Sequence, residues 1–181
     1  MSDDLHLSAM PKVQRLVEKA RSDGYTVIIS KQIINNEPGY YKGRTIFLGD
    51  NYLKGENPKF PEDRMVVVFL HEMGHVKFQQ SPYEPNELKS NRAADELAAF
   101  MYSLNESNRM ADEGDHGPLM MAVHYITKRA QSGRQLPAYQ QALDTLMGAP
   151  LWSESVARVE RLKLQGVPDI TEPQGWDWPR M

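Results

Sequence analysis

The stretch that decides the fold is Arg64-Met65-Val66-Val67-Val68-Phe69-Leu70-His71-Glu72-Met73-Gly74-His75. Six consecutive apolar residues lead into two histidines that are four positions apart. The stretch follows Pro61-Glu62-Asp63, and both Pro and acidic side chains are favoured in the first turn of a helix. We therefore expect a buried helix that begins near Pro61 and carries both histidines on one face, because residues four apart lie one turn apart.

His71 to His75 forms an H-E-x-x-H motif. Two imidazoles one turn apart can bind one Zn²⁺ from the same side, at roughly 2.0–2.1 Å each. Glu72 lies about 100° around the helix from His71, so it can reach a zinc-bound water without being a ligand. Gly74 leaves room for a second helix to approach. The motif predicts zinc ligation by His71 and His75, with Glu72 as general base.

A catalytic zinc ion needs a third protein ligand and an open position for water. The chain has no cysteine, so that ligand must be Glu, Asp or His. The expected helix over residues 86–104, for which Asn86 is a suitable N-cap, is the best source. The residues that share one face of this helix are Glu87, Asn91, Ala94, Asp95 and Ala98.

This helix can be aligned with the H-E-x-x-H motif in two ways, which place different residues next to the metal. In the first, Glu87 binds the metal and Asn91, one turn later, orients His71. In the second, Asp95 is the ligand or the orienting group and Asn91 faces the ion. Asn is neutral and a poor zinc ligand, so we prefer Glu87 and keep Asp95 as the alternative.

Three segments together resemble the ImmA/IrrE metallopeptidases, a gluzincin family. They are Gly43-Arg44-Thr45-Ile46-Phe47-Leu48, the stretch 64–75, and Glu87-Leu88-Lys89-Ser90-Asn91-Arg92-Ala93-Ala94. The family pattern is a short strand, a loop, an apolar helix running into H-E-x-G-H, and an E-x-x-A-N-x-x-A helix, in which Ser90 here replaces the usual Ala. The resemblance covers residues 40–100.

The resemblance implies a thermolysin-like minimal zincin core to which this chain adds C-terminal helices. It implies His71, His75 and Glu87 as zinc ligands and Glu72 as general base. It also implies that the substrate is a protein or peptide, such as a regulator.

The rest of the chain predicts an α+β fold with a small antiparallel sheet packed on a helical bundle. Hydrophobic spacing after Pro11 indicates a helix that ends at Asp23-Gly24. Residues 25–30 and 45–48 are expected to be antiparallel strands, and residues 50–61 an exposed loop. Further helices are expected over residues 119–131, 137–147 and 153–164. We expect one metallopeptidase domain over residues 1–166 and a Pro- and Trp-containing tail over residues 167–181, either extended as a strap or disordered.

The amino-acid composition excludes several classes of site and partner. The absence of cysteine in 181 residues excludes disulfides, thiolate metal sites and cysteine nucleophiles. A net charge of −3 gives no reason to expect a nucleic-acid partner. The acidic start of the chain precedes no apolar segment, so we expect a cytoplasmic protein without a membrane anchor.

The function expected from the sequence is zinc-dependent hydrolysis of peptide bonds. The alternative is a non-catalytic, metallopeptidase-like regulatory domain that binds metal or a partner; an intact Glu72 favours catalysis. His116, His124 and Tyr125 are candidates to stabilise the tetrahedral oxyanion. Residues 45–48 are a candidate edge strand along which an extended substrate would align.

Overall fold

In this computed structural model, the described residues are 6–31, 38–78, 88–133 and 136–176, with the backbone alone for 88–91. They form a small sheet and a larger set of helices. The elements are a 3₁₀ turn at Leu7–Ala9, α1 (Pro11–Ser22), β1 (Thr26–Ser30), β2 (Gly39–Lys42), β3 (Thr45–Gly49), α2 (Asp50–Leu53), α3 (Glu62–Phe78), α4 (Leu88–Asp112), α5 (Gly117–Ser132), α6 (Pro137–Met147) and α7 (Pro150–Leu164). The expected α+β class is confirmed.

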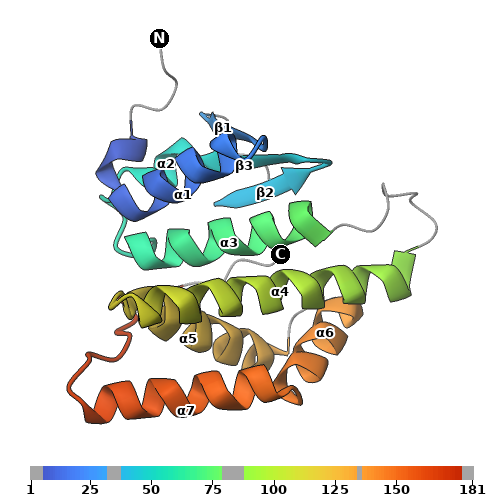
Figure 1. Cartoon of the computed structure of the whole chain (residues 1–181), viewed down its shortest axis with the longest axis vertical. Helices are drawn as coiled ribbons and strands as arrows, with labels where there is room; N and C mark the ends of the chain where they lie inside the picture. Colours follow the sequence, from blue (N-terminus) through green and yellow to red (C-terminus); the bar gives the residue numbers. More distant parts are fainter. Residues whose placement is uncertain (1–5, 32–37, 79–87, 134–135, 177–181) are drawn as a thin grey trace.

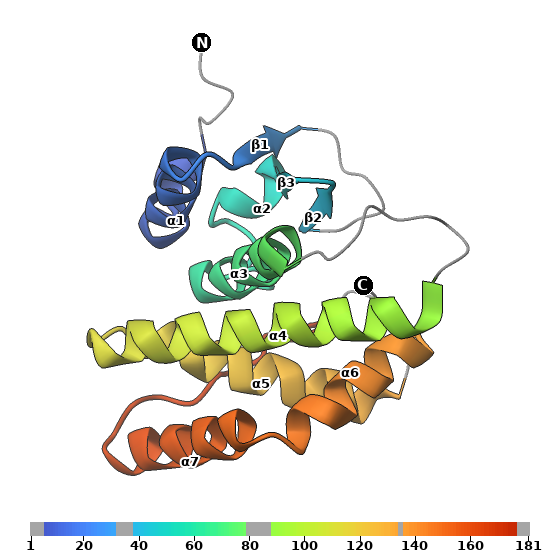
Figure 2. The ribbon, with the colours of Figure 1, turned by 45° about the vertical axis from the view of Figure 1, so that its right-hand side comes forward.

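Helix α3 lies between two layers. The sheet and α1 cover one side of it, whereas α4 covers the other side and separates most of it from α6 and α7 (Figures 1 and 2). Every residue of α3 from Arg64 to Val76 is buried. Its apolar side chains therefore contribute to two cores, one against α1 and the sheet and one against the C-terminal helices. An apolar helix without a polar face is expected at such a central position.

The sheet is mixed, so the expected antiparallel pairing of residues 25–30 with 45–48 is wrong. The strand order is β1-β3-β2, with β1 parallel and β2 antiparallel to β3. The tight hairpin turn is Gly43-Arg44, between the paired residues Lys42 and Thr45, and Gly43 has a φ of 60°. Because β2 forms this hairpin with β3, β1 takes the other side of β3. Strand β3 is therefore central among the described strands, which corrects the expectation that residues 45–48 form an edge.

The expected exposed loop over residues 50–61 is also wrong in its first turn. Residues Asp50–Leu53 form the short helix α2, in which Leu53 is fully buried. The Asp50 carboxylate is buried as well and lies 2.7 Å from Nδ1 of His6. One apolar anchor and one paired carboxylate thus hold this turn against the N-terminal layer.

The helices expected after the motif are confirmed. The expected range 137–147 is α6, while α5 and α7 each begin a few residues earlier than expected. Helix α4 continues past the expected residue 104 to Asp112 and is the longest described helix. No helix within the described ranges has the length and apolar character needed to cross a membrane.

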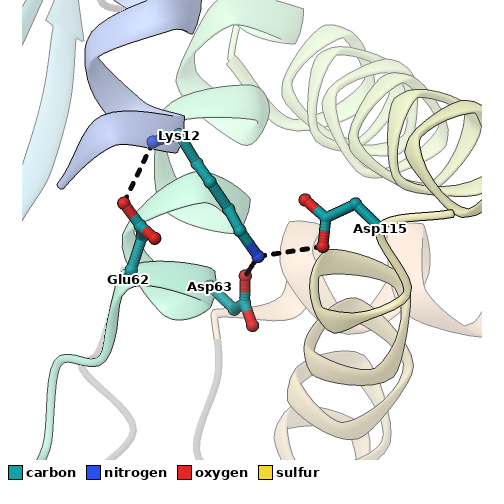
Figure 3. A network of polar contacts seen from close by, with 4 residues as sticks. All are labelled: Lys12, Glu62, Asp63 and Asp115. Carbon is teal, nitrogen blue, oxygen red and sulfur yellow. Dashed lines mark hydrogen bonds and ion pairs between the residues drawn. The ribbon is translucent and has the colours of Figure 1, made fainter. Parts of the chain in front are cut away.

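A network centred on Lys12 ties the N-terminal layer to the rest of the molecule (Figure 3). The Lys12 Nζ atom donates hydrogen bonds to Asp63, at 2.8 Å, and to Asp115, at 2.9 Å. The Lys12 backbone N–H donates to Glu62 at 3.0 Å, so a carboxylate from α3 caps α1. Gly117 lies beside it, and a Cβ there would come within 2.1 Å of Asp63 Oδ2, so a larger residue would displace the Asp63 carboxylate.

We expect Lys12→Met to lower the free energy of unfolding by about 1–2 kcal/mol, because it leaves the Asp63 and Asp115 carboxylates without their shared cation. Chemical denaturation measures the change. Lys19→Met is the matched control: its pair with Asp23 is exposed on α1, so the expected change is below ~0.5 kcal/mol. Equal losses in the two variants would contradict the role of the network.

Candidate metal site

Three potential metal ligands converge where α3 meets α4. His71 Nε2 lies 3.1 Å from Glu96 Oε2, and His75 Nε2 lies 3.2 Å from the same oxygen. The two Nε2 atoms are 3.2 Å apart. Two histidines from α3 and one carboxylate from α4 therefore form a nearly equilateral triangle of ligand atoms. Within the described residues, this is the one group of three such side chains that could hold a metal ion.

The close crossing of the two helices makes this triangle possible. A Cβ atom at Gly74 would lie 2.7 Å from the Cα of Ala99 and 3.1 Å from its carbonyl oxygen. Real Cβ contacts are never this short, so only glycine fits. Ala99 lies three residues after Glu96 on α4. The contact between Gly74 and Ala99 therefore brings the Glu96 side chain within reach of both imidazoles. The expected role of Gly74 in helix approach is confirmed.

The site is enclosed by aromatic rings. His71, Glu72, His75 and Glu96 are each at most 4% exposed. The Tyr41 ring, from β2, stacks on the His75 ring with centroids 4.4 Å apart. The Phe100 ring, one turn beyond Glu96 on α4, lies 4.5 Å from the His71 ring. These contacts fix the orientation of both imidazoles before any metal binds.

The donor set and its spacing fit a divalent metal ion. Tetrahedral ligands at about 2.0–2.1 Å from a zinc ion are separated by roughly 3.3 Å, close to the separations found here. His Nε2 and carboxylate oxygen are ordinary zinc ligands. The triad could therefore hold a metal ion.

The protonation states also suit metal binding. Burial lowers the pKa of His71 to about 4, although its hydrogen bond to Glu96 opposes this shift. Burial alone would raise the pKa of Glu96, but hydrogen bonds with His71 and His75 outweigh it and hold that pKa well below its usual range. At neutral pH His71 is therefore neutral and Glu96 is ionised. Metal ligation requires these forms.

The sequence-predicted residues differ in where they lie. His71, Glu72 and His75 lie within about one buried turn of α3, as their spacing predicts. Glu87 lies outside the described residues, and Asn91 is described by its backbone alone. Asp95 is half-buried next to Glu96 and is not part of the triad. Burial raises the pKa of its carboxyl group.

Glu96 was not among the sequence candidates. The face considered there carries Glu87, Asn91 and Asp95, whereas Glu96 lies on the adjoining apolar face with Ala93, Phe100 and Leu104. The spacing of these buried residues is three or four positions, which is the period of a core-facing helix stripe. A carboxylate in the middle of that stripe is the signal that would have identified it, because a buried charge needs a partner.

A small cavity of about 10 Å³ lies beside His71. That volume is close to the minimum for one water molecule. Tyr125 of α5 lines the cavity together with His71, and its hydroxyl accepts a hydrogen bond from the buried Arg129 at 3.1 Å. His124, another candidate for the oxyanion, instead contacts Glu172 at 2.8 Å.

We expect Gly74→Ala to lower the free energy of unfolding by about 1–3 kcal/mol, because the added methyl group forces α3 and α4 apart. This loss opposes the gain that alanine normally brings to a helix interior. Gly148→Ala is the control, since a Cβ there meets its nearest atoms at 3.6 and 3.8 Å, an ordinary contact distance. Chemical denaturation compares the two; a Gly74→Ala variant as stable as the parent would contradict the close crossing.

Comparisons of the chain with protein-family models, with curated proteins and with solved structures found no match.

Proposed function

We propose that this protein is a zinc-dependent metallopeptidase in which His71, His75 and Glu96 hold the metal ion. The observation that carries the proposal is the convergence of these three side chains beside Glu72, within one buried helix crossing. Three protein ligands are the number found in catalytic zinc sites, which keep a fourth position open, whereas structural sites are closed by four. The described residues supply three potential metal ligands.

Glu72 is the proposed general base. A zinc ion supplies Lewis acidity, which makes a water molecule acidic near neutral pH and polarises the carbonyl group of the substrate. Glu72 accepts the proton of the attacking water and delivers it to the leaving amine as the peptide C–N bond breaks. Its place on α3 between the two histidines supports this role, because the metal ligands and the base then keep a fixed geometry.

Tyr125 is the best placed of the three candidates for stabilising the oxyanion. It lines the cavity beside His71, whereas His124 pairs with Glu172 and His116 precedes α5 next to Asp115. Burial raises the pKa of Tyr125, so its phenol stays protonated and able to donate. The adjacent Arg129 guanidinium polarises the phenol towards donation.

We further propose that the chain belongs with the ImmA/IrrE metallopeptidases and acts on a protein or peptide, such as a regulator. The segment Glu96-Leu97-Ala98-Ala99 supports this, because it matches the E-x-x-A part of the family pattern. Here Ala stands three residues after the Glu, whereas Ser90 stands three residues after Glu87. Ala99, the small residue of that pattern, is the residue that contacts Gly74 where α3 and α4 cross. The edge strand β2, whose Tyr41 stacks on His75, is the strand that would align an extended substrate.

One observation favours the second candidate, a metal- or partner-binding regulatory domain without hydrolysis. All four site residues are buried, and the neighbouring cavity is far smaller than a peptide. A metal held in such a place would stabilise the α3–α4 crossing even without turnover. Hydrolysis therefore requires that the site open.

We expect the purified protein to contain one zinc ion per chain, and Glu96→Ala to weaken zinc binding by more than roughly a hundredfold, since loss of a supporting residue alone costs 10–100-fold. Asp95→Ala is the matched control: it removes the neighbouring carboxylate and leaves the triad intact. Metal analysis after dialysis against a zinc buffer measures retention. Zinc retained by Glu96→Ala and lost from Asp95→Ala would assign the ligand to Asp95.

Glu87→Ala completes that comparison. Loss of zinc from this variant, with retention by Glu96→Ala, would restore the ligand set that the family resemblance implies. Absence of zinc from the parent protein under zinc-replete conditions would exclude the metal site.

We expect Glu72→Gln to retain zinc but to lower peptide hydrolysis by about 10²–10⁴-fold, because it removes the general base and preserves side-chain shape. The measurement is a comparison of new peptide N-termini formed in a cell extract by the parent and by the variant. Glu113→Gln, at an exposed position, is expected to match the parent. Equal cleavage by Glu72→Gln would show that Glu72 is not the base, and zinc binding without any cleavage by the parent would favour the regulatory alternative.

A further inference from the structure

We propose that Arg129 is a charge-balancing residue of the His71–His75–Glu96 site. It offsets the Glu96 carboxylate when the site is empty, and it limits how tightly the site binds a divalent cation. The inference rests on the proposed function, since it concerns the regulation of the same metal site. Arg129 comes from α5, which packs on both α3 and α4 and lies with α6 on the far side of α4 from the sheet (Figure 1). Although it is a cation, it is only 3% exposed.

Three aromatic side chains link Arg129 to His71 from two directions. In the first direction, the guanidinium donates a hydrogen bond to the Tyr125 hydroxyl at 3.1 Å, and Tyr125 and His71 line the same cavity. In the second direction, the guanidinium carbon lies 5.1 Å from the centre of the Tyr139 ring. The Tyr139 ring meets the Phe100 ring edge to face at 6.0 Å, and the Phe100 ring lies 4.5 Å from the His71 ring. These contacts hold the guanidinium beside the ligand triad, within the same buried region.

The charges of Arg129 and of the triad act on each other. Burial alone would lower the pKa of Arg129, but the phenols of Tyr125 and Tyr139 and the carboxylate of Glu96 outweigh it and raise that pKa. Burial is the main cause of the low pKa of His71, and the positive charge of Arg129 adds to this shift. The only carboxylate of the triad therefore has a permanent buried cation as its neighbour.

This arrangement stabilises the site when it holds no metal ion. A buried carboxylate is costly unless it has hydrogen bonds or an opposite charge close by. His71 and His75 supply hydrogen-bonding groups to Glu96 at 3.1 and 3.2 Å. Arg129 adds a full positive charge, because a guanidinium stays protonated at all ordinary pH values. We therefore expect the empty site to keep its folded geometry.

The same cation opposes metal binding. A divalent ion held by the triad would add two positive charges close to the Arg129 guanidinium, and like charges repel one another more strongly in buried surroundings than in water. The repulsion lowers the metal affinity of the triad below that of the same three ligands without the cation. Because the empty form stays folded, the occupancy of the site follows the supply of metal.

Zinc titration of the full-length protein against a chromophoric chelator tests this role, after EDTA treatment and dialysis have removed metal and EDTA. Arg129→Met keeps an unbranched apolar side chain but removes its charge. We expect this variant to bind zinc roughly tenfold more tightly than the parent, because the repulsion is lost. Damage to packing would weaken binding, so the direction of the change separates a charge effect from a structural one. Arg129→Lys restores a cation and is expected to bind zinc within about threefold of the parent.

Lys128→Met is the matched control. It removes a cation from the preceding position of α5, about 100° around the helix from Arg129, where the side chain is partly exposed to water. Its zinc affinity is expected to stay within about twofold of the parent, because solvent screens an exposed charge. Arg129→Met that binds zinc no more tightly than the parent, or an equal gain in Lys128→Met, would overturn the charge-balancing role.

If Arg129→Met is unfolded without metal, as judged by circular dichroism, addition of zinc decides the question. Folding on addition of zinc supports the role, because the metal ion replaces the missing positive charge, whereas a chain that stays unfolded overturns it. A parent that binds zinc while Arg129→Met shows no gain refutes this inference alone and leaves the metal site intact. A parent that binds no zinc refutes both, and no readout depends on peptide hydrolysis.

Discussion

The crossing of α3 and α4 at Gly74 and Ala99 is the constraint on which the candidate site depends. A carboxylate side chain can reach two imidazoles on a neighbouring helix only when the two backbones approach closely. Gly74 and Ala99 permit that approach, with a would-be Cβ only 2.7 Å from the opposite Cα. Residues on either side of the contact are then fixed in register. Glu96 faces His71 and His75, and Phe100 packs on His71 one turn further along.

Burial of charge is the cost of this arrangement. Glu96, Glu72, Arg64 and Arg129 are all buried near the middle of the molecule. Each buried charge requires an opposite charge, hydrogen bonds or aromatic faces. Glu96 has two imidazoles. Arg64 lies near the rings of Phe60 and Trp176 and donates a hydrogen bond to the Lys59 carbonyl oxygen, and Arg129 lies over the rings of Tyr125 and Tyr139. A cluster of this kind stabilises the fold less than apolar packing would, and such clusters are typical of functional sites.

The parts of the structure that the sequence predicted are those set by local spacing. Three such features each depend on only one or two helical turns: the spacing of His71 and His75, the acidic first turn before Arg64, and the small residue at Gly74. The pairing of β1 with β3 depends on which strand forms the hairpin, and the two-residue turn at Gly43-Arg44 is a weaker signal than the Asn- and Pro-rich cluster before it. To identify Glu96 as a ligand, it is necessary to know which face of α4 packs on α3. The face with more polar residues suggested Glu87 and Asp95, whereas the apolar stripe through Ala93 and Phe100 is the one that packs.

The two sides of the site are held by different kinds of contact. On the sheet side, β2 is hydrogen-bonded to β3, and Tyr41 stacks on His75. The Lys12 network and the α1 cap fasten that layer to α3 and to the loop before α5. On the opposite side, residues 167–176 contain no helix or strand. Val167, Ile170 and Trp176 pack them on the core of the C-terminal helices, and two ion pairs and one cation–π contact add to this packing. Opening the sheet side would break backbone hydrogen bonds and separate a core layer. Displacing residues 167–176 would likewise withdraw Val167, Ile170 and Trp176 from the core of the C-terminal helices, so both sides of the site are closed by buried apolar packing.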